Sequence, residues 1–333
     1  MNCKKEHENN KKISKKSIVV LILAIIVIAV LGIVLYSIDK SGTVPADKKN
    51  SDVETIKVGD KNYKPKKSIE TYLFMGVDSK DKITENIEEP GQCDMLMLLV
   101  RDTSDDSFIT LPINRNTITD VDTLDDNGKV LATTPVQIAL AHANGEGKEL
   151  SCKNTVNAVS KLLGGHEIDG YIAVNMGAIP TINHLAGGVT VKIEDDFSKS
   201  DASLKKGETV HLTDKQAEHY IHDRINVGKG LNDSRMRRQS TYVNALKPVM
   251  KEKIKADGKF ANTIYESIND YMVTNIDKGR FAKIALLLAN DKDSGEIKIT
   301  GKEDLDELGW EEFIPDENSV KDAITQLFYK RCD

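Results

Sequence analysis

An uninterrupted apolar run, SIVVLILAIIVIAVLGIVLYSI, occupies residues 17–38 and contains no charged side chain. As a helix, these 22 residues would extend roughly 33 Å, which is enough to cross the hydrocarbon core of a bilayer. A cleaved signal peptide is the alternative, but its apolar core would be shorter, and no small-x-small cleavage site follows Ile38. The run therefore predicts an uncleaved transmembrane anchor.

The charges that precede this run predict its orientation. Residues 1–16 hold six lysines and two glutamates. Because positively charged flanks stay on the cytoplasmic side, we expect a single-pass protein of the cell membrane with a cytoplasmic tail and an extracellular remainder. Residues 39–68 are polar and lack a sustained apolar period, which predicts an extracellular stalk.

The composition limits the size and the class of the region beyond the stalk. The chain has 333 residues, of which 39% are hydrophobic, so it can form one large domain or two ordinary ones. Its net charge of −6 argues against a nucleic-acid-binding protein, which normally presents a basic surface.

The pattern of apolar segments predicts an α/β domain with a mixed central sheet flanked by helices over residues 69–257. Three short apolar runs predict buried strands at 69–78, 94–102 and 107–114, and the TSDD turn between the last two makes them antiparallel neighbours. Residues 258–333 are expected to form a helical extension packed on this domain. The remaining predicted elements are helices at 135–143, 155–165, 177–188, 212–224 and 235–255, and strands at 171–175 and 189–193.

Arginines cluster in the stretch YIHDRINVGKGLNDSRMRRQ, residues 220–239. Helical spacing puts Arg235, Arg238 and Gln239 on one face, near the start of a helix. Guanidinium groups and a helix N-terminus both favour a phosphate group. The alternative is structural, because surface helices often carry arginines and Asn232, Asp233 or Ser234 would serve as an N-cap.

Six short motifs in a specific order resemble the LytR–CpsA–Psr family of Gram-positive envelope proteins over roughly residues 70–255. They are TYLFMGVDSKD (71–81), CDMLMLLV (93–100), ITLPINRNT (109–117), LAGGVTVKI (185–193), GETVHLTDKQAEHYIHDR (207–224) and SRMRRQ (234–239). The layout of a cytoplasmic tail, one anchor and an outside domain also resembles this family.

The resemblance implies a transferase that moves a glycopolymer from an undecaprenyl-pyrophosphate carrier to peptidoglycan through a phosphodiester link. It implies that Asp94 helps to hold Mg²⁺ and, with Arg115, acts in catalysis, and that Asp78 belongs to the opening motif. It also implies a long apolar cavity for the polyprenyl chain, which we expect to be lined by residues from the helices at 155–163 and 235–254. The residues implied to bind the pyrophosphate are Arg115, Arg224, Arg235, Arg238 and Gln239.

Three positions depart from the family pattern. Asn116 stands where the family has an aspartate, His222 where it has an arginine, and Asn232 or a displaced Asp233 where it has another aspartate. Asn116 can ligate Mg²⁺ through its amide oxygen but adds no charge, so we expect weak Mg²⁺ binding until substrate phosphates complete the shell. An active transferase, a non-catalytic binder of lipid pyrophosphates and a pyrophosphate hydrolase therefore all remain open.

The cysteines leave a further alternative. Cys3 precedes the anchor, whereas Cys93, Cys152 and Cys332 lie on the predicted extracellular side, where disulfides form. Three cysteines cannot all pair within one chain, so a Cys93–Cys152 bridge and buried free thiols are both possible.

Overall fold

The computed structural model describes residues 55–85, 87, 89–223, 226–228, 232–289 and 293–332. The predicted tail, the predicted anchor at 17–38, most of the predicted stalk and Arg224 lie outside these residues. Within the described part of the chain, no helix combines the length and the apolar character that crossing a membrane requires.

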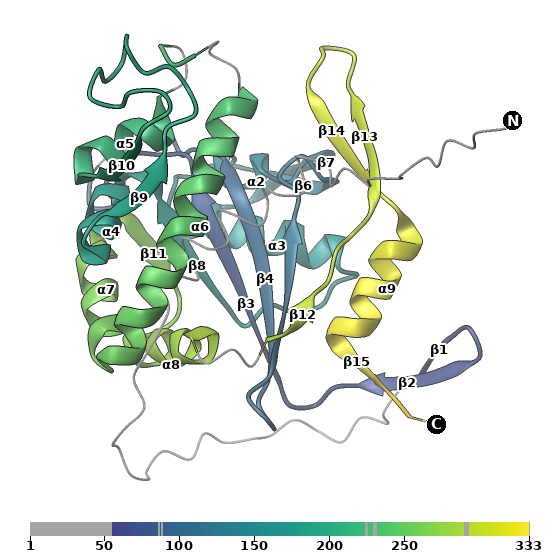
Figure 1. Ribbon diagram of the computed structural model, residues 1–333. Helices are drawn as coiled ribbons and strands as arrows, with labels where there is room; N and C mark the ends of the chain where they lie inside the picture. Colours follow the sequence, from purple (N-terminus) through teal and green to yellow (C-terminus); the bar gives the residue numbers. More distant parts are fainter. Residues whose placement is uncertain are drawn as a thin grey trace, which may run out of the picture.

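A six-stranded mixed sheet forms the centre of the molecule (Figure 1), and its strands follow the order β11-β8-β3-β4-β5-β12. The predicted hairpin is present, since β4 and β5 pair antiparallel across the TSDD turn, and β4 also pairs antiparallel with β3. β8 runs parallel to β3, and β12 runs parallel to β5. The strands are β3 (Ile69–Val77), β4 (Cys93–Asp102), β5 (Phe108–Ile113), β8 (Gly170–Asn175), β11 (Met272–Thr274) and β12 (Asp293–Glu296).

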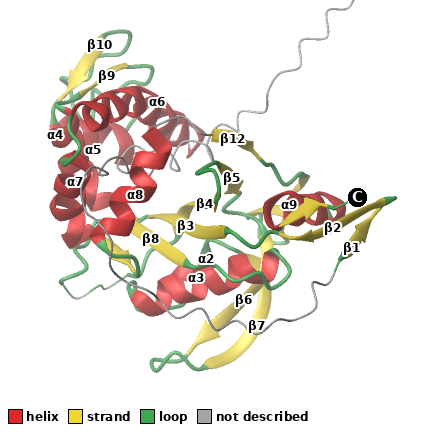
Figure 2. Cartoon of the chain, turned by 90° about the horizontal axis from the view of Figure 1, so that it is seen from below, coloured by secondary structure: helices red, strands yellow, loops and turns green. Residues whose placement is uncertain are grey.

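The sheet is covered on both faces, which explains why β3 and β4 are continuous apolar runs rather than alternating ones. Tyr72 and Phe74 of β3 face one core, and their neighbours Leu73 and Met75 face the other. Figure 2 shows the first face covered by α6 and α8, and the second by α2 and α3. The helices are α2 (Leu140–Ala143), α3 (Glu149–Leu162), α4 (Ile179–Ala186), α5 (Asp214–His222), α6 (Asn232–Ala256), α7 (Phe260–Ile268), α8 (Lys278–Ala289) and α9 (Glu317–Phe328), with short 3-10 turns η1 (Met176–Ala178) and η2 (Asn269–Tyr271).

This arrangement corrects the expected lipid cavity. Val159 of α3 packs in one core and Val243 of α6 packs in the other, so the sheet lies between these two helices. A cleft lined jointly by 155–163 and 235–254 is therefore wrong. An apolar periodicity identifies which face of a helix is buried but not which face of the sheet receives it.

Residues 258–333 also differ from the predicted helical extension. They supply β11 and β12, which are the two edge strands of the central sheet, as well as α7, α8 and α9. They also form the hairpin of β13 (Gly301–Leu305) and β14 (Glu311–Pro315) and the last strand β15 (Tyr329–Arg331), which pairs with β2 (Lys61–Pro65) beside β1 (Ile56–Val58). The segment is thus part of the same fold, because each short edge strand gains its hydrogen bonds only from a distant neighbour.

The predicted helix at 135–143 is only partly helical. Its first three residues belong to β7 (Val130–Gln137), which pairs with β6 (Ile118–Leu124), and α2 covers only its last four residues. The turn carries Asn127 and Gly128, with Gly128 at φ +78°, which is a typical hairpin signal. Cross-strand pairing therefore makes residues 135–137 a strand, although Pro135 was expected to begin a helix.

Two further small elements complete the fold. β9 (Val189–Lys192) pairs antiparallel with β10 (Thr209–Leu212), next to α5. Cys93 and Cys152 are free thiols buried in the core between the sheet and α3, so of the two alternatives for this pair the structure has the unbridged one; Cys332 is also free.

Candidate functional site

Strand ends bring the first site residues together. Asp94 is the second residue of β4, Asp78 directly follows β3 and Arg115 lies two residues beyond β5. All three are at the same end of the sheet because these neighbours are antiparallel. Arg115 Nη1 lies 2.5 Å from Asp94 Oδ1. The sequence prediction that Arg115 and Asp94 share one site therefore has a geometric basis.

The first turns of α6 add Arg235 to these residues. Its Nη2 lies 3.8 Å from Asp94 Oδ2, and its Nη1 lies 3.9 Å from Asp78 Oδ2. Arg235 thus bridges the two carboxylates from the helix side, while Arg115 approaches from the strand side. We call Asp78, Asp94, Arg115 and Arg235 the acid–arginine cluster.

Asp94 is the buried member of this cluster, with only 7% of its side chain exposed. Burial raises the pKa of its carboxyl group, the positive charge of Arg115 opposes that rise, and the nearby charge of Asp78 adds to it. Arg115 Nη1 forms a close ion pair with Oδ1, and no other described residue donates a hydrogen bond to this buried oxygen, so one acceptor position of Oδ1 remains among the described residues.

Gly91 and Gln92 fix the turn beneath Arg115. Arg115 Nη2 donates a hydrogen bond to Gln92 Oε1, and the backbone N–H of Asp78 donates to the Gln92 carbonyl at 2.9 Å. Gly91 has φ +73°, and a Cβ there would lie 2.8 Å from the Asp78 carbonyl oxygen. Only glycine permits this close approach, which sequence analysis did not identify as part of the site.

Asn116 does not face Asp94 in this structure. Its backbone N–H donates to Asn114 Oδ1 at 3.0 Å, and its side-chain Nδ2 donates to Glu311 Oε2 at 3.3 Å. The expected pair of metal ligands, Asp94 and Asn116, is therefore not assembled. Across the described ranges, no group of three or more His, Cys, Asp and Glu side chains is placed to hold a metal.

The geometry separates Arg238 from Arg235. Arg238 is 2% exposed; its Nε donates to the Tyr220 carbonyl at 2.8 Å, its Nη1 pairs with Asp195 Oδ2 at 2.8 Å and its Nη2 donates to the Asp223 carbonyl. Its guanidinium also lies over the Phe197 ring. The prediction that Arg238 binds pyrophosphate is not supported by this position. The Arg238 side chain instead joins α6 to the end of α5 and to Asp195 in the interior of the protein.

Gln239 differs from Arg238 in its hydrogen bonding. It is also 2% exposed, but its side-chain Nε2 has no hydrogen-bond partner among the described residues. A buried amide N–H group without a partner is unfavourable unless a ligand or a water molecule accepts a hydrogen bond from it. Gln239 therefore remains a candidate for ligand contact, next to the turn that carries Arg235.

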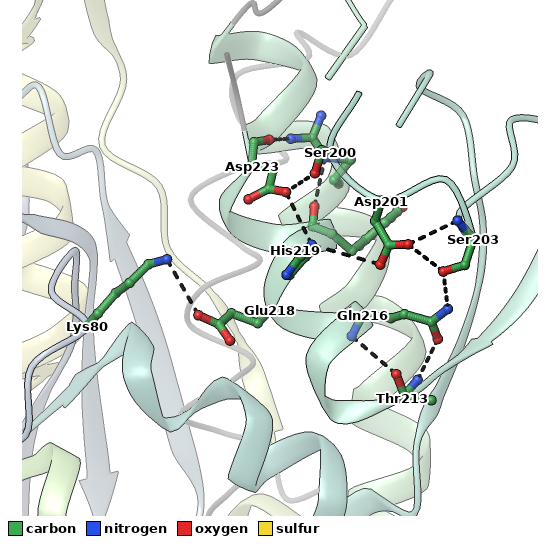
Figure 3. A network of polar contacts seen from close by, with 11 residues as sticks. Lys80, Ser200, Asp201, Ser203, Thr213, Gln216, Glu218, His219 and Asp223 are labelled. Carbon is green, nitrogen blue, oxygen red and sulfur yellow. Dashed lines mark hydrogen bonds and ion pairs between the residues drawn. The ribbon is translucent and has the colours of Figure 1, made fainter. Parts of the chain in front are cut away.

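A polar network holds the end of α5 (Figure 3). His219 Nδ1 lies 3.6 Å from Asp223 Oδ2 and 3.9 Å from Asp201 Oδ2, and Ser200 donates to Asp223. At the other end of the helix, Thr213 and Gln216 form a capping box. Side-chain contacts therefore hold α5 at both of its ends.

His222 occupies the position of a family arginine on the last turn of α5. Its pKa is lowered by burial and then by the positive charge of Lys80, while Asp78 raises it. A histidine held neutral here offers fewer donors than an arginine would. The structure therefore places His222 near the cluster without giving it a cationic role.

An open cavity of about 540 Å³ adjoins the acid–arginine cluster. Arg115, Asn116 and Arg235 line it together with residues of the β13–β14 hairpin, among them Trp310. This volume is in the range of small-ligand sites. The sequence analysis did not identify the β13–β14 hairpin as a wall of the cavity. The signal that could have found it is the lone tryptophan, which directly follows the turn residues Asp306–Gly309.

The structure thus defines a mixed α/β domain in which a buried carboxylate lies between two arginines that line a cavity. The chain belongs to the LytR_cpsA_psr family, whose family model matches residues 33–328. The resemblance inferred from the motifs is thereby confirmed.

Individual relatives agree with this membership. The chain is 27% identical, over 329 residues, to a Bacillus mycoides protein named polyisoprenyl-teichoic acid–peptidoglycan teichoic acid transferase TagU, covering 93% of this chain and 96% of the relative. The crystal structure of B. subtilis TagV matches with a TM-score of 0.54 at 24% identity, over 79% of this chain and 96% of that one. A Streptococcus agalactiae protein matches with a TM-score of 0.55 at 18% identity, over 78% and 86%. These structural matches show the fold.

Proposed function

We propose that this protein is a cell-wall glycopolymer transferase, which takes a glycopolymer from an undecaprenyl-pyrophosphate carrier and links it to peptidoglycan by a phosphodiester. The observation that carries the proposal is the acid–arginine cluster at the mouth of the cavity. Membership of the family and the activity stated in the name of the B. mycoides relative support it.

The cluster suits the chemistry because phosphoryl transfer depends mainly on positioning and on neutralising charge. Arg115 and Arg235 would hold the pyrophosphate oxygens. A hydroxyl oxygen of the acceptor would then bond to the phosphorus that bears the glycopolymer, the bond from that phosphorus to the bridging oxygen would break, and polyprenyl phosphate would leave. The hydroxyl proton would pass to a carboxylate, for which Asp94 is the candidate, since burial raises its pKa.

Mg²⁺ belongs to this proposal as a partner of the substrate. Asp94 fits it, because the buried Oδ1 has an unused acceptor position and Mg²⁺ is commonly held by one or two carboxylates together with substrate phosphates. When bound, the ion would neutralise charge on the pyrophosphate. Asn116, turned toward Glu311, would join only after its amide rotates.

The membrane setting is part of the proposal as well. A cytoplasmic tail and a single-pass anchor at 17–38 would keep the domain at the outer surface of the cell membrane, where a polyprenyl carrier is embedded. The polyprenyl chain would enter on the α6 side of the sheet, because Arg235 lies at the start of that helix. Met95 and Met97 face that side, and methionine adapts readily to a flexible apolar ligand.

A second candidate function is a non-catalytic receptor for lipid pyrophosphates, and the orientation of Asn116 favours it. With one buried carboxylate and an amide directed elsewhere, the site would bind the pyrophosphate without assembling a complete metal centre. Such a receptor would regulate or scaffold envelope assembly.

One assay separates these functions. The full chain, in detergent, would be given an undecaprenyl-pyrophosphate-linked glycopolymer with and without peptidoglycan fragments, and release of undecaprenyl phosphate would be measured. A transferase releases it only with the acceptor, a hydrolase releases it without, and a receptor binds the donor and releases nothing. Absence of donor binding would overturn both the transferase and the receptor.

A further inference from the structure

The β13–β14 hairpin is fixed against the candidate site by backbone and side-chain bonds. The Phe313 N–H donates to the Asn116 carbonyl at 2.8 Å, and Gln137 Nε2 donates to the Glu311 carbonyl at 2.6 Å. A parallel bridge also joins Thr117 to Phe313. These contacts attach the hairpin to the residues next to Arg115, so its turn forms a wall of the cavity rather than a free arm.

The turn holds Trp310 in place at that wall. Asp306 Oδ1 accepts the N–H of Leu308 at 2.9 Å and that of Trp310 at 2.7 Å, and the Asp306 N–H donates to the Trp310 carbonyl at 2.9 Å. Trp310 nevertheless remains 65% exposed. A hydrogen-bonded turn thus presents the indole ring of Trp310 in the lining of the cavity. This arrangement is suited to stacking against a ligand.

The lining of the cavity carries both signs of charge. Arg115 and Arg235 contribute positive charge, whereas Asp306, Glu311 and Glu312 contribute negative charge from the hairpin that carries Trp310. A pyrophosphate is attracted to the two arginines, but a polymer rich in phosphate is repelled from the hairpin. The hairpin wall therefore suits an uncharged ligand that has both a flat apolar face and many hydroxyl groups.

We propose that Trp310 and the carboxylates of the β13–β14 turn form a subsite for the neutral saccharide that carries the acceptor hydroxyl. A pyranose ring offers a face of C–H groups to the indole and hydroxyl groups to the carboxylates and to the amide of Gln137, which also lines the cavity. The site disfavours a glycopolymer that is rich in phosphate, because its phosphates are repelled by the carboxylates. This inference rests on the proposed transferase function and names the element that would select its acceptor.

Binding can be measured without any turnover, because Trp310 is the only tryptophan in the chain. The probe is chitotetraose, a neutral chain of β-1,4-linked N-acetylglucosamine, added to the full protein in detergent. We expect a blue shift of the tryptophan emission and weaker quenching by acrylamide. Poly(glycerol phosphate), a phosphate-rich polymer, should cause neither change, and Glu312→Lys should reduce this discrimination.

Transfer kinetics give the second test. Trp310→Ala should raise the KM for the acceptor by about tenfold and leave the KM for the donor unchanged, whereas Trp310→Phe should restore most of the affinity. Leu308→Ala is the matched control, since Leu308 is 84% exposed on the same turn and does not line the cavity. Thermal unfolding of each variant shows whether the fold is retained.

The two tests separate the subsite from the proposed function. A fluorescence response to chitotetraose without transfer would retain the subsite and reject the transferase. Transfer with an unchanged acceptor KM in Trp310→Ala would retain the transferase and overturn the subsite. A fluorescence response to poly(glycerol phosphate) but not to chitotetraose would also overturn it, and would identify the donor polymer as the ligand.

Discussion

Asp94 illustrates how one residue is defined by its surroundings. It is nearly buried, and its charge is balanced by Arg115 at 2.5 Å and Arg235 at 3.8 Å. A buried carboxylate without such partners would be strongly unfavourable as an anion. The same two arginines face the cavity, so the residues that allow Asp94 to stay buried are also those available to an anionic ligand.

The arginines of α6 should therefore differ sharply in their effect on binding. Arg235→Ala should weaken binding of a lipid pyrophosphate by about 1–3 kcal/mol, the usual range for a hydrogen bond to a charged group. Arg237→Ala is the control, since Arg237 pairs with Glu194 and Asp195 away from the cluster. Titration calorimetry with both variants measures the difference, and equal losses would mean that the ligand binds diffusely.

The side chain of residue 116 should control Mg²⁺ binding. Asn116→Asp alone puts a carboxylate beside Glu311, whose Oε2 lies 3.3 Å from the present amide nitrogen, and the two charges would repel. The double variant Asn116→Asp with Glu311→Gln removes that repulsion and should tighten Mg²⁺ binding by about tenfold in the presence of a pyrophosphate lipid. Calorimetry that shows no change in the double variant would exclude residue 116 as a ligand.

Acid should destabilise the fold partly through His142. Burial lowers the pKa of this histidine from its ordinary value of 6.5, although the Gly91 carbonyl, 3.1 Å from Nδ1, opposes the shift. The folded state therefore favours the neutral ring, so the contribution of His142 to the unfolding free energy is fully present above pH 6.5. It is lost as the pH falls toward the lowered pKa, because the unfolded chain takes up the proton first.

The variant His142→Asn tests this dependence, because its amide can keep the hydrogen bond to Gly91. Between pH 6.5 and 5 the unfolding free energy should fall less steeply than in the wild type, by up to about 1.4 kcal/mol per pH unit. Denaturant unfolding across this range gives the slopes. Parallel curves for the two proteins would show that His142 does not titrate on unfolding.

Helix α5 shows how far an element depends on local bonds. Its capping box joins Thr213 and Gln216, three residues apart, and the motif is recognisable in the sequence. Its far end is held by His219, which lies near Asp223 of the same helix end and near Asp201 of the loop after β9. The helix start is therefore predictable from sequence, and the anchoring of its end is not.

Removal of the cap should destabilise the protein moderately. Thr213→Ala loses the hydrogen bond to the Gln216 N–H and should lower the unfolding free energy by about 1 kcal/mol. Thr263→Ala, an exposed threonine inside α7, is the control and should be close to neutral. A loss at Thr263 equal to that at Thr213 in thermal unfolding would contradict the capping role.

At the scale of the whole molecule, the sheet is completed by residues far from its centre in sequence. β11 pairs with β8 at one edge and β12 pairs with β5 at the other, and both strands come from residues 258–333. Phe281 and Ile284 of α8 are buried in the core on the α6 side. The predicted boundary at residue 257 therefore cuts through one core.

Truncation tests this conclusion. A chain ending at residue 257 should fail to fold, because it exposes two sheet edges and the apolar surface that α7 and α8 cover. A chain ending at residue 332 is the control. Circular dichroism and a cooperative thermal transition distinguish them, and a cooperative transition in the shorter chain would restore the boundary at 257.

Much of the frame was predictable from sequence because its signals are local. The buried strands β3, β4 and β5 are continuous apolar runs, and only the five residues 103–107 separate β4 from β5. The family motifs located Asp94, Arg115 and Arg235, which do meet in space. Periodicity and short motifs report on neighbours along the chain, and these features depend on such neighbours.

Only the tertiary structure decided the rest. Arg238 and Arg235 look equivalent by helical spacing, yet Arg238 meets Asp195, 43 residues away, in the interior. Gln137 holds the β14 strand 174 residues away, which places Trp310 at the cavity. Such contacts have no local signal, because they exist only once the sheet has closed and packing has fixed which side chains face each other.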